Sequence, residues 1–145
     1  MADTRTVQPT RNVRGAVLTV RASDTVAQAA RIMSGHKVGA LVVTDDAGRA
    51  VGIVSERDIL TDVVAEDLPA GRTPVVEVMT VNLVSCAMAT GYAEARRLMA
   101  EHGIRHLPIL EDGRPVGMLS IRDVLTYELA RARRRAAVPP WTDPC

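Results

Sequence analysis

The sequence contains one segment twice, and this duplication restricts the possible folds more than any other feature. Residues 52–60, Gly-Ile-Val-Ser-Glu-Arg-Asp-Ile-Leu, return at 117–125 as Gly-Met-Leu-Ser-Ile-Arg-Asp-Val-Leu, with five of nine positions identical. Upstream, further identities occur one residue out of phase: Ala27, Ala29, Arg31, Met33, His36, Leu41 and Asp46 match Ala93, Ala95, Arg97, Met99, His102, Leu107 and Asp112. A unit of about sixty residues that occurs twice predicts two halves packed on each other, with two similar sites.

The hydrophobic pattern of the first half predicts the element order β-α-β-β-α. The apolar run at 17–20 is expected to be a strand, and Thr25 and Gln28 have the spacing of a capping box at a helix start. Apolar residues follow at helical spacing: Val26, Ala29, Ala30 and Met33. Strands are expected at 40–43 and 50–54, joined as a hairpin by a short Gly-containing turn. The next helix, from Ser55, should bury four apolar side chains: Ile59, Leu60, Val63 and Val64.

The second half repeats this order. Strands are expected at 83–86, 106–110 and 116–119, and helices at 91–102 and from Ser120. The predicted fold class is therefore α+β, with two β-α-β-β-α repeats related by pseudo-two-fold symmetry, each a small sheet with helices on one face. Along the chain we expect a flexible lead at 1–13, a first repeat at 14–68, a linker at 69–74, a second repeat at 75–130, and a basic helix end and tail at 131–145.

The composition argues against several classes of function. Net charge is +1, from 18 basic and 17 acidic residues, so no global field attracts nucleic acid or an anionic membrane. Aromatic residues make up 2% of the chain, too few for a platform that stacks bases. We interpret the four arginines within 131–135 as a solvated helix C-terminus, with an anion or RNA contact as the alternative. Without a signal peptide or a membrane-length apolar run, a cytoplasmic protein is expected.

The duplicated segment carries the chemistry. Each copy has a strand that ends in Gly, two apolar residues and Ser and leads directly into a helix. The Ser hydroxyl and the free backbone N–H groups of the first helical turn favour binding of a phosphate. The Asp three residues after the Ser is an acceptor-only carboxylate, suited to the two hydroxyls of a ribose, and the adjacent Arg can pair with phosphate oxygens. The candidates are Ser55, Arg57 and Asp58, and Ser120, Arg122 and Asp123. For a single copy a capped helix is the favoured explanation; two copies that keep Ser-x-Arg-Asp favour a ligand site.

This order and the Gly-h-h-Ser-x-x-Asp motif (h, apolar) resemble a cystathionine-β-synthase (CBS) domain, and the tandem resembles a CBS pair over roughly residues 13–130. The resemblance implies an adenosine-containing ligand (AMP, ADP, ATP, S-adenosylmethionine or NAD(H)) in clefts between the copies. It assigns the ribose to Asp58 and Asp123, and the phosphates to Ser55 and Ser120 with Arg57 and Arg122. Candidates for an aliphatic adenine wall are Val38, Gly39, Ala40, Ile104, Arg105, His106, Leu18, Thr19, Val84 and Ser85.

The two copies differ at positions that matter for a ligand. Gly39 in the first copy corresponds to Arg105 in the second, and Pro108 has its usual family place where the first copy has Val42. The residue after the motif serine is acidic in the first copy alone, Glu56. We therefore expect unequal sites, with the second site, bearing Arg105 and Arg122, binding the more highly charged nucleotide.

Three hypotheses remain open at this stage. The leading one is a non-catalytic adenosine-nucleotide sensor that acts in trans on an unknown protein target, and the alternative is an interaction or dimerisation module with vestigial clefts. An enzyme is disfavoured because neither motif serine has a histidine at predictable reach, and no required cofactor is expected. His36, His102 and His106 lack a cluster of ligands at metal spacing. The family resemblance also implies a homodimer formed through the helical faces.

Overall fold

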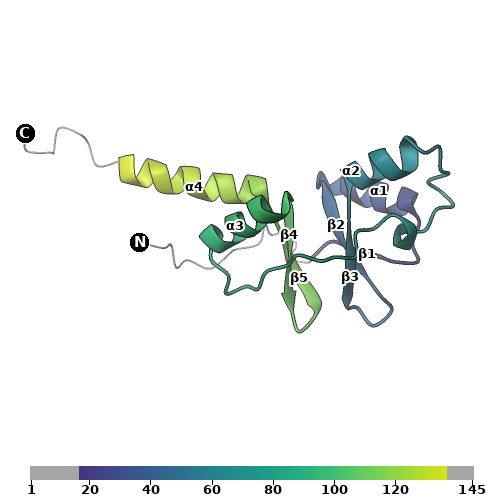
Figure 1. Cartoon of the computed structure of the whole chain (residues 1–145), viewed down its shortest axis with the longest axis horizontal. Coiled ribbons are helices and arrows are strands. Elements are labelled where there is room, and N and C mark those ends of the chain that lie inside the picture. The colour runs from purple at the N-terminus through teal and green to yellow at the C-terminus, as the bar shows by residue number, and fades with distance from the viewer. Residues whose placement is uncertain (1–16, 137–145) are drawn as a thin grey trace, which may run out of the picture.

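The computed structural model describes residues 17–136 (Figure 1). The predicted lead at 1–13 and the tail beyond Ala136 lie outside the described residues. The elements are β1 (Thr19–Arg21), α1 (Val26–His36), β2 (Ala40–Thr44), β3 (Ala50–Ser55), α2 (Glu56–Ile59), the π-helical turn η1 (Leu60–Val64), the 3-10 turn η2 (Val75–Glu77), α3 (Tyr92–His102), β4 (His106–Glu111), β5 (Arg114–Ser120) and α4 (Ile121–Ala136). The mixed α+β fold with two small sheets confirms the predicted class.

The first half has the full predicted order. Its sheet runs β1-β2-β3, with β1 parallel and β3 antiparallel to the central β2, whose five residues are all buried. The predicted capping box is present: the Gln28 N–H donates to Thr25 Oγ1 at 3.2 Å, and the Thr25 N–H donates to Gln28 Oε1 at 2.7 Å. This cap orients α1 so that its apolar stripe enters the core through Val26, Ala29 and Met33.

The second half lacks one predicted strand. Its sheet contains only β4 and β5, and the strand expected at 83–86 is reduced to a single parallel bridge between Cys86 and Ile109. The Cys86 N–H donates to Pro108 O, and the Leu110 N–H donates to Cys86 O, both at 2.9 Å. The next bond of a parallel ladder would need an N–H at position 108, which proline does not have. Val42 holds the equivalent place in the first half, where β1 forms.

The helix after β3 also departs from expectation. Val63 is buried, but Leu60 is 61% and Val64 is 62% exposed, so placing these two on the buried side was wrong. A π-helical turn follows here, in which the Ala65 N–H donates to Leu60 O at 2.9 Å. The turn does not explain the exposure, because the equivalent Leu125 and Leu129 in the regular helix α4 are each 54% exposed. In both halves this side of the helix faces away from the core, and no element of the described residues covers it.

The two halves are joined at their hairpin turns. The Ala50 N–H donates to Gly113 O at 2.9 Å, and Arg114 Nη1 donates to Ala47 O at 2.7 Å. Figure 1 shows these hairpins side by side, with α1 and α2 above one sheet and α3 and α4 beside the other. This arrangement places the starts of the middle strands, β2 and β4, between the halves.

Helix α4 is anchored to α3 by contacts specific to the second half. The Tyr92 and Tyr127 rings stack at 3.9 Å, and Arg96 Nη1 lies 2.8 Å from Glu128 Oε1. Beyond this anchor α4 continues to Ala136, as predicted, and extends away from the body in Figure 1.

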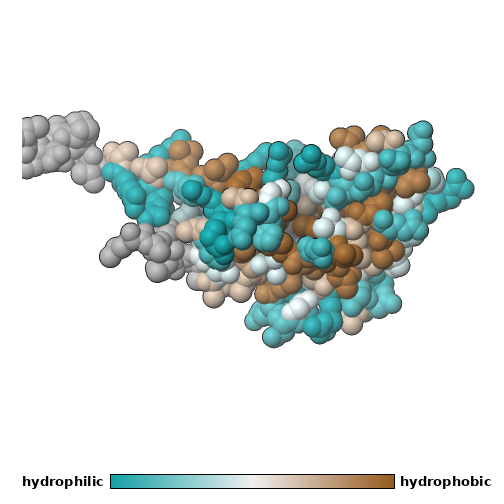
Figure 2. Space-filling view, viewed as in Figure 1, coloured by the Kyte–Doolittle hydropathy of each residue, from teal (hydrophilic) through white to brown (hydrophobic). Residues whose placement is uncertain are grey.

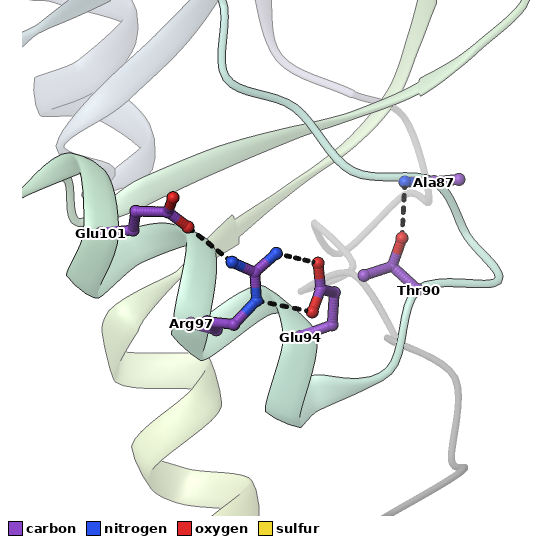
Figure 3. A network of polar contacts seen from close by, with 5 residues as sticks. All are labelled: Ala87, Thr90, Glu94, Arg97 and Glu101. Atoms are coloured by element: carbon purple, nitrogen blue, oxygen red, sulfur yellow. Dashed lines mark hydrogen bonds and ion pairs between the residues drawn. The ribbon is translucent and has the colours of Figure 1, made fainter.

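A separate network lies on the exposed surface of α3 (Figure 3). Arg97 Nη1 donates to Glu101 at 2.6 Å and Arg97 Nε donates to Glu94 at 2.9 Å. The hydrogen bond from Arg97 lowers the pKa of Glu94. Because these charges are exposed, the network makes α3 polar on its outer side without contributing to the site between the halves.

Gly52→Ala should destabilise the protein. A Cβ at this position would lie 2.7 Å from Met79 Sδ and 3.0 Å from the carbonyl oxygen of Thr80, which also accepts the Ile53 N–H. We expect a loss of about 1–3 kcal/mol in the free energy of unfolding, measured by urea titration. Gly71→Ala is the control, because nothing lies within 4 Å of its Cβ position. Equal stability of both variants would contradict this account of Gly52.

A candidate ligand cleft between the two halves

A cleft of about 850 Å³ lies between the halves, a volume suited to a small molecule. Both halves line it. The first half contributes the start of β2 and the residues around α1 and α2, and the second contributes the start of β4, strand β5 and the first turn of α4. The lining residues are Val17, Leu18, Ala30, Met33, Ser34, Lys37, Val38, Gly39, Ala40, Glu56, Ile59, Arg105, His106, Val116, Gly117, Met118, Ser120, Ile121, Arg122 and Asp123.

The cleft brings together one of the two predicted residue sets. The whole second motif lines it, opposite wall residues that come mainly from the first half: Ser120, Arg122 and Asp123 with Leu18, Val38, Gly39, Ala40, Arg105 and His106. The first motif and the remaining wall candidates do not line this cleft: Ser55, Arg57, Asp58, Thr19, Ile104, Val84 and Ser85. A complete set of polar and aliphatic groups therefore forms across the boundary between the repeats.

The motif serine and aspartate cap each other. Asp123 Oδ2 accepts from the Ser120 N–H and hydroxyl, both at 2.8 Å, and the Asp123 N–H donates to Ser120 Oγ at 3.2 Å. Ser55 and Asp58 repeat this geometry in the first half. The capping explanation therefore holds in both copies. It is compatible with ligand binding, because Asp123 Oδ1 makes no hydrogen bond within residues 17–136.

Backbone donors at the helix start are fewer than the sequence indicated. The Ile121 N–H donates to Arg105 O at 2.8 Å, and the Asp123 N–H is taken by Ser120. Among these first-turn donors, the Arg122 N–H is left without a partner in the described residues. An anion here would therefore depend on cationic side chains, and the cleft has three: Lys37, Arg105 and Arg122.

Sequence reasoning missed Lys37. This residue ends α1 in the left-handed conformation with φ 54°, where its counterpart in the second half, Gly103, has φ 63°. The sequence did contain a signal for Lys37, because a long cationic side chain stands at a helix end where the left-handed conformation favours glycine. The turn carries Lys37 to the edge of the cleft.

Glu56 lines the same cleft as Arg105 and Arg122. Comparison of the two repeats predicts that Glu56 belongs to the site of the first motif, and that the site of the second motif has no acidic residue at this place. That expectation was wrong. The reason is that the first residue of α2 and the first turn of α4 face each other across the boundary between the halves. The Glu56 N–H donates to Gly39 O at 2.9 Å, which holds it at the cleft.

His106 lies half-buried between these charges. Burial lowers its pKa below the ordinary 6.5, while the Glu56 and Asp123 carboxylates act in the opposite direction and Arg105 lowers it further. The imidazole is therefore neutral at neutral pH. A Cβ on Gly39 would lie 3.3 Å from Glu56 Oε1 and 3.4 Å from His106 Cε1, so these three residues meet in the cleft.

Two further sequence expectations concern metals and membranes. Within residues 17–136, no group of three or more His, Cys, Asp or Glu side chains is placed to hold a metal ion. Over the same residues, no helix combines the length and the apolar character needed to cross a bilayer.

Comparison with known proteins identifies the family. The family model of the CBS domain matches residues 9–65 and 75–130, once for each half. The CBS domain-containing protein YhcV of Bacillus subtilis is 34% identical over 122 residues, which cover 84% of this chain and 86% of that protein. A CBS-domain protein structure from Burkholderia ambifaria superimposes with a TM-score of 0.74 at 34% identity, covering 80% of this chain and 85% of the other.

The fold and both matches define a tandem CBS pair, a class of regulatory module. The chain belongs to the CBS domain family. Larger relatives contain this unit as one part: a CBS domain-containing protein of Arabidopsis thaliana is 39% identical over 117 residues, which cover 81% of this chain and 21% of that protein. The chain therefore spans about a fifth of that relative's length.

His106 should make stability depend on pH. Because burial lowers its folded pKa, the unfolded chain binds a proton at a pH where the folded chain does not. This contribution to the free energy of unfolding should be full above the ordinary value of 6.5 and fall as the pH drops from there to the folded pKa. His106→Gln should reduce the decrease, measured by urea unfolding at about pH 7.5 and about pH 5.5.

The control is His36→Gln, at the exposed end of α1, which should keep the wild-type dependence on pH. An unchanged decrease in the His106→Gln protein would show that other groups cause it.

Proposed function

We propose that this protein is a non-catalytic sensor of an adenosine nucleotide, which it binds in the cleft between its halves. The observation that carries the proposal is that Asp123, whose Oδ1 makes no hydrogen bond within residues 17–136, lines one cavity of about 850 Å³ together with an aliphatic wall from the opposite half. Each half alone offers only part of these groups.

The chemistry of the lining suggests how a nucleotide lies. The aliphatic side chains of Leu18, Val38 and Ala40 suit the faces of an adenine ring. Asp123, held by its cap, can accept from the ribose hydroxyls, as a carboxylate has no proton to donate at neutral pH. Arg122 and Lys37 are then available for phosphate. AMP, ADP, ATP, S-adenosylmethionine and NAD(H) all contain the adenosine that these groups would recognise.

A ligand that contacts both halves favours the arrangement in which both sets of contacts are made. Its binding free energy can therefore bias the position of one half relative to the other, and with it the affinity for a protein target in trans. We infer regulation rather than catalysis because the Ser120 hydroxyl bonds to a carboxylate in its own cap instead of a basic histidine. We propose a cytoplasmic location, because the two cysteines of the chain do not make a disulfide framework.

We also propose a homodimer formed through the apolar helix surface. Four exposed side chains define this surface: Leu60, Val64, Leu125 and Leu129. The two pairs are equivalent in the duplication and spaced i, i+4, so each forms a continuous stripe. Figure 2 shows apolar surface over α2–η1 and along α4. A surface repeated by internal pseudo-symmetry can match itself on a second copy about a two-fold axis. A dimerisation module without a ligand is the alternative function that this surface favours.

Asp123→Asn should abolish most nucleotide binding without removing the helix cap. The amide oxygen of Asn can still accept from Ser120, but its nitrogen cannot accept from a ribose hydroxyl. We expect AMP affinity to fall about 10- to 100-fold, the equivalent of one hydrogen bond to a charged group. The measurement is calorimetric titration of protein shown to be free of bound ligand.

The matched control is Asp58→Asn, which alters the same cap in the half whose motif does not line the cleft. Loss of AMP binding in this variant alone would move the site to the other motif. Absence of binding to all five ligands by the wild-type protein would favour the dimerisation module.

Leu60→Glu combined with Leu125→Glu should convert the dimer to a monomer, because each substitution places a charge in the apolar helix surface. Sedimentation velocity would measure the change. Val81→Glu is the control, since Val81 is 65% exposed but lies outside this surface. A monomeric wild-type protein, or a dimer that survives the double substitution, would contradict the proposal.

A further inference from the structure

We propose that Glu56 sets the charge of the ligand that the cleft accepts, favouring a nucleoside monophosphate over a triphosphate that carries no divalent cation. This inference rests on the proposed function, because it names the ligand class of the same site. It concerns a residue outside the sets predicted to bind ribose, phosphate or adenine.

The first argument is the fixed position of Glu56. Its N–H donates to Gly39 O at 2.9 Å, which holds the start of α2 against the wall strand. Its Oε1 lies 3.3 Å from the point where a Cβ of residue 39 would be, and glycine there leaves the space open. The carboxylate is thus directed at the wall of the cleft, across from the first turn of α4.

The second argument is that this charge is not neutralised inside the protein. Glu56 forms no ion pair or side-chain hydrogen bond with any residue in the range 17–136, and the same holds for Lys37, Arg105 and Arg122. Three unpaired cations and the Glu56 carboxylate therefore line one cleft with Asp123. A single phosphate can be held by the cations. Each additional phosphate adds negative charge to a site where Glu56 already opposes it, unless a divalent cation lies between them.

The third argument comes from the duplication. The residue equivalent to Glu56 is Ile121, which lines the same cleft from the opposite half. The chain thus has a carboxylate at one of two equivalent positions and an alkyl group at the other. A helix cap does not require this carboxylate, because Ser55 and Asp58 form the cap themselves. Its charge therefore acts on His106 and on whatever occupies the cleft.

The test is calorimetric titration with AMP and with ATP, in EDTA and again with Mg²⁺, on wild type and Glu56→Gln. In EDTA we expect wild type to bind AMP at least about tenfold more tightly than ATP. Glu56→Gln should raise ATP affinity about tenfold and change AMP affinity by less than about threefold. Mg²⁺ should improve ATP binding more in wild type than in the variant.

Glu66→Gln is the matched control, since it removes the same charge from an exposed residue outside the cleft and should retain the wild-type preference. Glu56→Ile, which introduces the residue already present at 121, gives a second variant if the glutamine protein does not fold by circular dichroism. An AMP-to-ATP ratio that stays the same in both Glu56 variants would overturn the inference and leave the proposed function intact. Equal weakening of both nucleotides would overturn it as well. Wild-type protein that binds neither nucleotide would overturn both proposals.

Discussion

The reciprocal cap between a serine and the aspartate three residues later is the interaction on which each half depends. It fixes the residue at which a strand becomes a helix, and it holds the carboxylate in one orientation. Strand register then places the cap opposite the wall, since Ser55 pairs with Ala40 and Ser120 with His106. The geometry of the cleft is set by these two hydrogen-bonded strand–helix junctions and by the hairpin contacts that join the halves.

Duplication gave two halves with the same cap and different surroundings. Pro108 removes a ladder donor, so the second half holds its first segment through one bridge at Cys86. The Tyr92–Tyr127 stack secures α4 where the first half has a π-helical turn. The halves also contribute unequally to the site: one supplies most of the aliphatic wall and Glu56, and the other supplies the polar groups of its motif.

Much of the fold could be predicted because it follows from local chemistry. The capping box at Thr25, the helix from Ser120 and both hairpins depend on residues close in sequence. The errors arose where strand pairing or side-chain burial was decided by distant parts of the fold. Pro108 limits a strand more than twenty residues before it, and Leu60 and Val64 stay exposed because no element of the described residues packs on that side of their helix. Hydrophobic spacing contains neither effect, because it does not say which elements pack against a given side of a helix.

The candidate site likewise has features that local sequence predicts and features that only packing decides. The sequence by itself determined the chemical groups: the duplicated motif specifies a capped helix start with a carboxylate and an arginine in each half. Only the tertiary structure decided that the second motif shares a cleft with Leu18, Val38 and Ala40, and that Lys37 and Glu56 belong to the same cavity. The physical reason is that hydrogen bonds within one turn are encoded by adjacent residues. The charge around a cleft between two halves is set by how their surfaces pack. The spacing of residues within either half does not predict this packing.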